Sequence, residues 1–368
     1  MDVIATRRAD ESPEVIRAGL PFVDRLELPV LGGCRAAARS LLAGVSGGSL
    51  QQAVYDCPAA RVAVQALLAE SPPDVVVAHL VRTAPWLPGP PHPPLVVDIQ
   101  DALSAQYSES RGHRRGWRGL AMALESQRIG AAEQAAVARA SALSFISASD
   151  RDAVPHAGVV SVLAGAAIDL DRFSPQGASV VSGRIGFLGN LRTASNRDMI
   201  GYFARVLFPA IRSAVPWAEL HIMGHEAGAD VRRLGRLPGV VFVGPVDDQV
   251  PELEACYLTV CPLRFGSGVQ NKVLESLAVG TPVIASTGAA AALASKDAPC
   301  PVISAELGAP FTAAVIALLG DHDRRASVGT AGQDWVRAVH RPERALAPLL
   351  DLVKQLGAAP TKPDASRA

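Results

Sequence analysis

The chain has 368 residues, 49% of them hydrophobic, and its 35 basic residues balance its 35 acidic ones. This length and apolar fraction are sufficient for two compact domains. Because the charge is balanced and no long run of Lys or Arg occurs, the composition gives no electrostatic basis for binding nucleic acid. The 5 cysteines lack the CxxC spacing of zinc sites and read as buried thiols of a cytosolic protein. They are Cys34, Cys57, Cys256, Cys261 and Cys300.

Along the chain, short apolar segments alternate with longer segments of helical spacing. The first half contains the expected strands at residues 3–5, 74–78, 95–98, 142–146 and 159–163. The second half contains those at residues 185–188, 219–223, 240–243, 258–261 and 282–285. This alternation is typical of parallel sheets covered by helices, so we expect two doubly wound α/β domains. We place them at residues 1–172 and 173–345, with a C-terminal helix over 346–357 and a tail over 358–368.

Neither a signal peptide nor a membrane span is expected. Charged residues follow the first apolar segment from Arg7 onward, so the N-terminus lacks the basic, apolar and cleavable pattern of a secretory signal. The longest uncharged stretch, residues 276–295, contains Gly280, Pro282 and Gly288. A buried helix end, a strand and a loop explain that stretch better than a membrane span. We therefore expect a cytoplasmic protein without a transmembrane segment.

The most informative segment follows the expected strand 258–261. Gly266 and Gly268 allow the backbone to bend close to a ligand, and helical spacing begins near Lys272 and stops at Gly280. A glycine loop that leads into a helix directs free N–H groups and the positive end of the helix dipole at one spot, which suits a phosphate. Lys272 and Glu275 share one helix face, so a cation and a carboxylate project toward the same volume. A diphosphate beside a ribose requires such a pair.

These residues also carry a resemblance to a known family. The segment GSGVQNKVLESLAVGTPVIAS, residues 266–286, resembles the nucleotide-sugar motif of group 1 retaining glycosyltransferases, and most closely the sugar transferases of bacterial exopolysaccharide clusters. Residues 185–190, 220–224 and 240–244 resemble strands of the donor domain in that family. The resemblance implies the GT-B fold, in which two Rossmann-like domains face a cleft. It also implies a nucleotide diphosphate sugar as donor, a hydroxyl acceptor that is lipid-linked or a small molecule, and neither a metal ion nor a cofactor. The resemblance further implies that the protein lies in the cytoplasm, either free or at the inner face of the membrane.

The donor residues implied by the resemblance lie in the second half. Lys272 and Arg264 would neutralise the phosphates and Glu275 would hold the ribose, although a solvated lysine, an ion-paired arginine and a helix-capping glutamate are the structural alternatives. Ser267 stands where many relatives have a second glutamate. Asn190 and Asn196 stand where many relatives have an arginine and a lysine, with Arg192 as a further helper cation. The remaining donor-binding candidates are Gly189, Gly266, Gly268, Gln270 and Asn271.

Candidates for the acceptor side lie in the first half. Asp98, Gln100 and Asp101 occupy the place where many relatives carry a histidine that faces the donor sugar. An aspartate at the end of a strand can orient or deprotonate an acceptor hydroxyl, and Asp101 can equally cap the next helix. His79 and Arg82 follow the strand 74–78 at a similar position, where a hydrogen-bonded structural histidine is the alternative. Glu125, Arg128 and Glu133 indicate a packed ion network on one long helix. 

The start of the chain predicts a departure from the family pattern. Group 1 relatives open with a strand and a glycine loop and only then reach a second strand. The segment Met1–Thr6 resembles that second strand already. We therefore expect the first domain to lack its first strand-helix unit, which would leave a strand edge or apolar surface uncovered.

Two other functions are compatible with two Rossmann-like domains. One is a non-catalytic subunit that binds a nucleotide sugar. This function is favoured by Asn190, Asn196, Ser267 and the missing histidine. The other is a nicotinamide-dependent oxidoreductase. The sequence disfavours the oxidoreductase because no GxGxxG follows an N-terminal strand. Measured sugar transfer or donor hydrolysis would separate the enzyme from the binding subunit.

Overall fold

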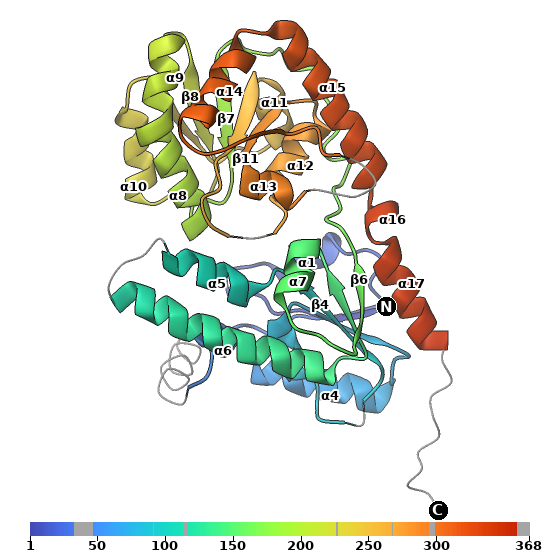
Figure 1. Ribbon diagram of the computed structural model, residues 1–368. Coiled ribbons are helices and arrows are strands. Elements are labelled where there is room, and N and C mark those ends of the chain that lie inside the picture. Colours follow the sequence, from blue (N-terminus) through green and yellow to red (C-terminus); the bar gives the residue numbers. More distant parts are fainter. Residues whose placement is uncertain are drawn as a thin grey trace, which may run out of the picture. The chain divides into compact units, whose positions relative to one another are not determined.

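A computed structural model of the chain describes residues 1–32, 47–90, 92–112, 117–225, 227–266, 268–293 and 299–358. Contacts divide it into two compact units, the first of Met1–Leu163 with Pro348–Ala368 and the second of Ala164–Ala347 (Figure 1). The change between the units comes ahead of the expected boundary at 172/173. The connecting segment belongs to the second unit because Ile168 N–H donates to the His340 carbonyl and Phe173 is buried.

The first unit contains a four-stranded parallel sheet in the order β3-β4-β5-β6. Its strands are β3 Val76–His79, β4 Leu95–Gln100, β5 Ala142–Phe145 and β6 Val160–Leu163. Strands β1 (Asp2–Ile4) and β2 (Arg25–Glu27) form a separate two-stranded parallel sheet. Among the described residues, the only pairing partner of β1 is β2, and the only pairing partner of β3 is β4. The expected absence of a first strand-helix unit stays a prediction.

Helices cover both faces of the four-stranded sheet, which explains why its central strands are continuously apolar. Leu95, Val97 and Ile99 of β4 pack in one cluster with residues of α4 and α6. Val96, on the opposite face of β4, packs against Leu352 of the C-terminal helix α17. The helices of this unit are α1 Pro13–Ala18, α3 Leu50–Tyr55, α4 Pro58–Glu70, the 3-10 helix η1 Val81–Trp86, α5 Leu103–Gly112, α6 Trp117–Arg139, α7 Ala148–Ala153 and α17 Ala347–Ala358.

The second unit is built on a six-stranded parallel sheet in the order β12-β11-β10-β7-β8-β9. Its strands are β7 Arg184–Leu188, β8 Glu219–Met223, β9 Val240–Gly244, β10 Leu258–Cys261, β11 Val283–Ser286 and β12 Ile303–Ala305. The chain runs outward from β7 through β8 to β9 and then returns to β10 on the other side of β7. In sheets of this kind, ligands bind beyond the carboxyl ends of the strands at that reversal.

The helices of the second unit bury a large aromatic and aliphatic core, with Phe187, Phe203, Phe208 and Phe311 fully enclosed. A π-helical turn, η2 Phe203–Leu207, joins α8 Ala194–Tyr202 to α9 Phe208–Ala214. The other helices are α10 Ala229–Arg232, the 3-10 helix η3 Arg233–Arg236, α11 Gln249–Glu254, α12 Asn271–Ala278, α13 Thr287–Ala291, α14 Ala309–Leu319, α15 His322–Val339 and α16 Pro342–Ala345. Both units are thus α/β with parallel sheets, as the sequence predicts.

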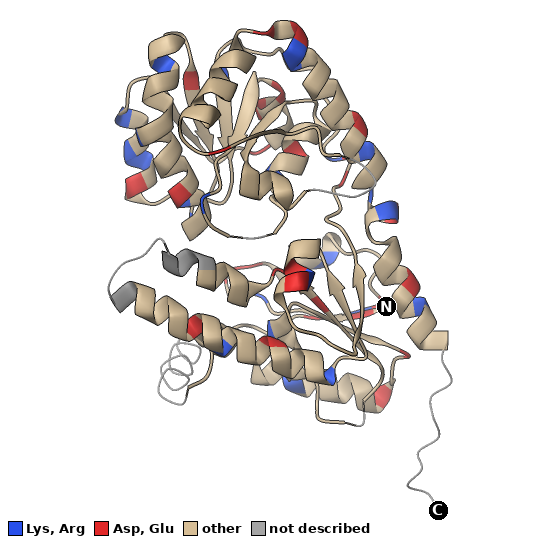
Figure 2. Ribbon diagram, in the orientation of Figure 1, with Lys and Arg blue, Asp and Glu red and all other residues tan. Residues whose placement is uncertain are grey.

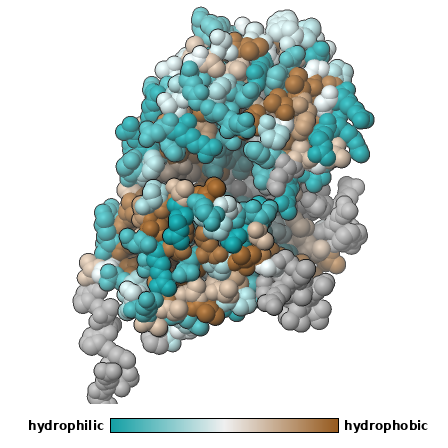
Figure 3. Space-filling model, turned by 180° about the vertical axis from the view of Figure 1, so that it is seen from behind, coloured by the Kyte–Doolittle hydropathy of each residue, from teal (hydrophilic) through white to brown (hydrophobic). Residues whose placement is uncertain are grey.

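Surface properties agree with the composition. Acidic and basic residues alternate along the ribbon of each unit (Figure 2), and hydrophobic residues lie among hydrophilic ones on the face seen in Figure 3. In the part of the chain that is described, no helix has the length and apolar character needed to cross a membrane. The uncharged stretch from residue 276 forms the end of α12 and then β11, as expected, and continues into the helix α13 where a loop was expected. Cys34 lies outside the described residues, whereas Cys57, Cys256 and Cys261 are buried free thiols.

Candidate functional site

The loop between β10 and α12 has the conformation that its glycines permit. Gly266 and Gly268 have φ angles of 106° and 86°, which disfavour any residue with a Cβ atom. Helix α12 then begins at Asn271, and no side-chain hydrogen bond caps it at Gln270. The Gln270 side chain instead reaches back, with Nε2 at 3.5 Å from the Gly268 carbonyl. The Val273 N–H donates to the Gln270 carbonyl over 2.8 Å, so the amides left to a ligand or to water are those of Asn271 and Lys272. Ser267 lies outside the described residues.

Lys272 is held inside the second unit, close to the ends of β7 and β10. Its Nζ donates to Asn196 Oδ1 and lies 5.1 Å from the centre of the Phe187 ring. Burial lowers the pKa of Lys272, with the Cys261 and Glu275 side chains opposing that effect. A partly desolvated ammonium group beside an uncapped helix start gains more from a bound phosphate than an exposed lysine does.

Asn196 connects three elements of this site. Its Nδ2 donates to the Asn190 carbonyl over 2.9 Å, and its Oδ1 accepts from Lys272 of α12. Asn190 Oδ1 accepts from the Arg192 N–H over 2.9 Å and closes the turn after β7. Neither asparagine supplies a positive charge, but Asn196 positions the lysine that does.

The backbones at the ends of β7 and β8 approach each other closely beside this site. A Cβ atom at Gly189 would lie 2.8 Å from Asn196 Nδ2. A Cβ atom at Gly224 would lie 1.8 Å from the Gly189 carbonyl oxygen, and Gly224 also has a φ of 147°. Of these two glycines, Gly189 was predicted as a site residue, whereas Gly224 was expected only as the end of a strand. A glycine directly after the strand was the available signal.

Glu275 lies one turn along α12 from Lys272. Burial raises the pKa of Glu275, whereas the charges of Arg172 and Lys272 lower it. Arg172, from the segment that connects the two units, was not among the predicted site residues. Its guanidinium lies 5.3 Å from the centre of the Phe173 ring. Two cations, Arg172 and Lys272, thus act electrostatically on the proposed ribose-binding carboxylate.

Arg264 forms an ion pair within the protein, which is the alternative to a phosphate-binding role. Its Nε and Nη2 donate to the two carboxylate oxygens of Asp198 over 2.8 and 2.6 Å, and its guanidinium lies 4.8 Å from the centre of the Tyr202 ring. The hydrogen bond to Asp198 raises the pKa of Arg264. A phosphate role for Arg264 would require that it share its charge with Asp198 or exchange partners.

In the first unit, two predicted residues come together where β3 and β4 end. His79 Nδ1 lies 2.8 Å from Asp98 Oδ2, and Gln100 Nε2 donates to the same oxygen over 2.6 Å. Arg82 is not part of this group, because its guanidinium stacks 3.9 Å from the centre of the Tyr55 ring. Asp101 is also separate and lies near Asp150 instead.

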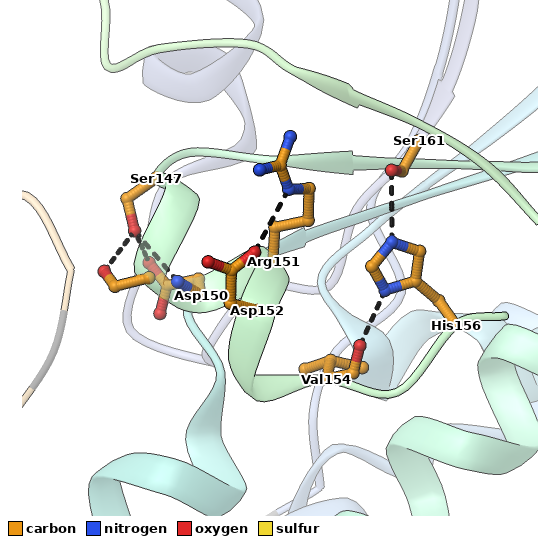
Figure 4. Close-up of polar contacts among 8 residues, drawn as sticks. Ser147, Asp150, Arg151, Asp152, Val154, His156 and Ser161 are labelled. Carbon is orange, nitrogen blue, oxygen red and sulfur yellow. Dashed lines mark hydrogen bonds and ion pairs between the residues drawn. The ribbon is translucent and has the colours of Figure 1, made fainter. Parts of the chain in front are cut away.

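A buried carboxylate that was not predicted from the sequence holds the segment after β4 in place. Asp150 accepts from the Ala102 N–H over 3.0 Å and from the Ser147 hydroxyl, which also caps α7 (Figure 4). The expected ion network on α6 takes another form, because two of its three members are held by neutral donors. Glu125 accepts from the Ser49 hydroxyl, and Glu133 accepts from the N–H and hydroxyl of Ser104.

Asp101 gives a pH-dependent prediction. Burial and the nearby Asp150 raise its pKa to about 6. A carboxyl group whose pKa is raised in the folded state stabilises the fold fully below its unfolded pKa of about 3.9, and that contribution is lost as the pH rises through 6. The Asp101→Asn variant should therefore lose less unfolding free energy between pH 5 and pH 8 than the unmodified protein. Urea denaturation at both pH values measures this, and equal losses would contradict it.

Comparisons with known proteins agree with this geometry. Residues 182–321 match the family model of glycosyl transferases group 1. Sucrose-phosphate synthase from Thermosynechococcus elongatus is 18% identical with a TM-score of 0.62, over 80% of this chain and 77% of that one. HepE from Anabaena, solved with UDP and glucose, is 16% identical with a TM-score of 0.65, over 96% and 100% of the two chains. A glycosyltransferase from Rickettsia africae is 10% identical with a TM-score of 0.56, over 96% and 97%.

The search of curated protein sequences gave no match. Among the described residues, no group of three or more His, Cys, Asp or Glu side chains is arranged to hold a metal ion. The structural similarities establish the fold, and the family match covers the part of the second unit that contains α12. The chain therefore has the GT-B fold, and its residues 182–321 match the model of the group 1 glycosyltransferase family.

Proposed function

We propose that this protein transfers a sugar from a nucleotide diphosphate sugar to a hydroxyl acceptor. The observation that carries the proposal is the start of α12, where the left-handed Gly266 and Gly268 lead to an uncapped first turn with Lys272 and Glu275 on one face. This start lies at the strand reversal between β7 and β10, where α/β sheets bind ligands. The UDP and glucose bound in the solved HepE structure support the same donor class.

Negative charge develops on the leaving diphosphate during the reaction, and the site must stabilise it. The amides of Asn271 and Lys272 and the Lys272 ammonium would stabilise that charge, because they are fixed in place before the reaction begins. Glu275 would accept hydrogen bonds from the ribose hydroxyls. Gly189, Asn190 and Gln270 would border the donor, and Arg264 would add a second cation if it shares its charge with Asp198.

The resemblance of residues 266–286 to group 1 retaining glycosyltransferases supports a more specific function. We propose that the transfer retains the configuration of the sugar, needs no metal ion and serves bacterial exopolysaccharide synthesis in the cytoplasm. A non-catalytic nucleotide-sugar-binding subunit is the competing function, because Asn190 and Asn196 lack the charge of the residues they replace. Transfer to any acceptor by the purified chain would decide for the enzyme.

A nucleoside diphosphate should stabilise the folded protein without a divalent cation. At one hundred times its dissociation constant the ligand should add about 2.7 kcal/mol to the free energy of unfolding. Thermal unfolding with UDP, GDP and dTDP in the presence of EDTA measures the effect. Stabilisation that disappears when EDTA is added would refute metal independence, and no stabilisation by any of the three would refute the donor site.

A further inference from the structure

Helix α8 of the second unit holds the glycine loop between β10 and α12 near both of its ends. At the start of the loop, Arg264 donates to both carboxylate oxygens of Asp198, and its guanidinium lies 4.8 Å from the centre of the Tyr202 ring. Just after the end of the loop, the Lys272 ammonium group donates to Asn196 Oδ1. The three partners on the other side of these contacts all belong to α8. One helix therefore fixes the two points between which the loop runs.

The segment between these two points contains residues that favour no single conformation. Gly266 and Gly268 have positive φ angles of 106° and 86°, and glycine loses more conformational freedom on ordering than any other residue. Directly ahead of Arg264, the Leu263 carbonyl accepts from the Ser286 hydroxyl over 2.8 Å, which ties the loop start to the end of β11. Without such contacts, a ligand would have to order the loop itself and would bind more weakly.

The ion pair of Arg264 with Asp198 is suited to fix the start of the loop. Nε and Nη2 donate to separate carboxylate oxygens over 2.8 and 2.6 Å, and such a two-pronged contact has a defined direction. The two side chains are 32% and 23% exposed, so the pair is partly withdrawn from water. If Arg264 moved to a phosphate, the Asp198 carboxylate would lose its cation and the loop start would be released.

A second ion pair on the same helix lacks this connection to the loop. Arg197 donates with Nε and Nη2 to a single oxygen of Asp230, over 3.1 and 2.8 Å, and so joins α8 to α10. The side chains of this pair are 46% and 47% exposed, and exposed pairs contribute little. Breaking it removes an ion pair from α8 while both contacts with the loop remain, so it provides a matched control.

We propose that Asp198 is a positioning residue for the nucleotide diphosphate, because it fixes the start of the glycine loop through Arg264. This inference rests on the proposed function. Asn196 fixes the end of the loop in the same way through Lys272. Arg264 then acts on the donor through the loop and does not itself contact the phosphates. The free amides of Asn271 and Lys272 are held in the phosphate-binding arrangement before the ligand arrives.

The first test measures the dissociation constants of UDP, GDP and dTDP for the full-length Asp198→Asn protein by titration calorimetry. In this variant the loop is ready to bind for only a fraction of the time, and the apparent dissociation constant rises by the inverse of that fraction. We expect a rise of about tenfold or more, which corresponds to the loss of a hydrogen bond between charged groups. In sugar transfer KM should rise by the same factor while kcat changes little, because the bound donor orders the loop.

The Arg264→Met variant separates the two roles that the arginine could have. If Arg264 were a phosphate ligand that Asp198 holds back, Asp198→Asn would tighten nucleotide binding and Arg264→Met would weaken it. If Arg264 anchors the loop, both variants weaken binding by the same factor, and the double variant binds no more weakly than either one. Tighter or unchanged binding in Asp198→Asn would overturn the inference, as would additive losses in the double variant. Asp230→Asn should keep the dissociation constants of the unmodified protein.

The second test needs no nucleotide. Hydrogen exchange of the backbone amides, followed by mass spectrometry on peptides that cover residues 262–273, measures how firmly the loop is held. Asp198→Asn should speed this exchange by about tenfold, the factor expected for one lost charged hydrogen bond, while peptides from β7 and β8 keep their rates. Asp230→Asn should leave the exchange of the loop unchanged.

The two tests distinguish failure of the inference from failure of the proposed function. Unchanged exchange of the loop in Asp198→Asn would overturn the inference, whatever the protein binds. If the unmodified protein binds none of the three nucleoside diphosphates, the proposed function fails, while hydrogen exchange still decides whether Asp198 anchors the loop.

Discussion

Replacing Lys272 by methionine should lower the rate of sugar transfer by about 10²- to 10³-fold while the protein stays folded. Removal of one preorganised charge stabiliser costs about 2.7–4 kcal/mol of barrier. The fold should be unaffected or stabilised, because burial already lowers the pKa of Lys272 and a methionine of similar length carries no charge to desolvate. Release of the nucleoside diphosphate measures the rate, and urea denaturation at pH 7 measures the stability.

Lys354 of α17 provides the matched control. Its side chain is 78% exposed and lies 3.9 Å from Asp351, a surface ion pair that contributes little. Lys354→Met should therefore leave both the rate and the stability unchanged. If Lys272→Met retained the normal rate but unfolded readily, Lys272 would be a structural residue and the phosphate site would have to be sought elsewhere.

The largest expected loss of stability follows from replacing Gly224 by valine. The new Cβ atom would lie 1.8 Å from the Gly189 carbonyl oxygen, and a φ of 147° is unsuited to a β-branched residue. Because the contact is with backbone, relief requires β7 and β8 to separate at their carboxyl ends. We expect a loss of about 3 kcal/mol or more in the free energy of unfolding, in the range of the most damaging core substitutions.

The control for this substitution is Gly288→Ala in α13. No atom lies within 4 Å of the Cβ atom that it would add, and its φ is not positive. An alanine there should stabilise the protein by about 0.4–1 kcal/mol, because it restricts the unfolded chain. Urea denaturation of the two variants measures both effects. A Gly224→Val protein as stable as the parent would show that the two strand ends separate without cost.

The sequence predicted well those features that depend on near neighbours in the chain. The loop with Gly266 and Gly268 and the helix that starts near Lys272 follow from glycine content and helical spacing alone, and the structure has both. The parallel sheets follow from the alternation of apolar segments with helical ones. The sequence places the domain boundary at 172/173, whereas the structure divides the chain after Leu163 and buries Phe173 in the second unit.

Features that depend on contacts between distant residues were beyond sequence reasoning. Lys272 and Asn196 are 76 residues apart in the sequence, and nothing in either segment indicates that they share a hydrogen bond. The same holds for Arg264 with Asp198 and for Asp150 with Ala102. The register shift at Gln100, where β4 pairs with β5, was equally hidden, because β4 reads as an ordinary apolar strand. Residue types at the strand ends could be chosen as candidates, but their partners could not.

The return of α17 to the first unit has a practical consequence for dividing this protein into fragments. Leu352 covers Val96 and Ala142, and a Cβ atom at Gly357 would lie 3.5 Å from the Asp74 Cβ atom. A fragment that ends at Leu163 would therefore expose one side of its own sheet and should aggregate. The first unit can be studied alone only if α17 is fused behind β6 through a linker or supplied as a separate peptide. Binding of such a peptide would then report on the integrity of the sheet.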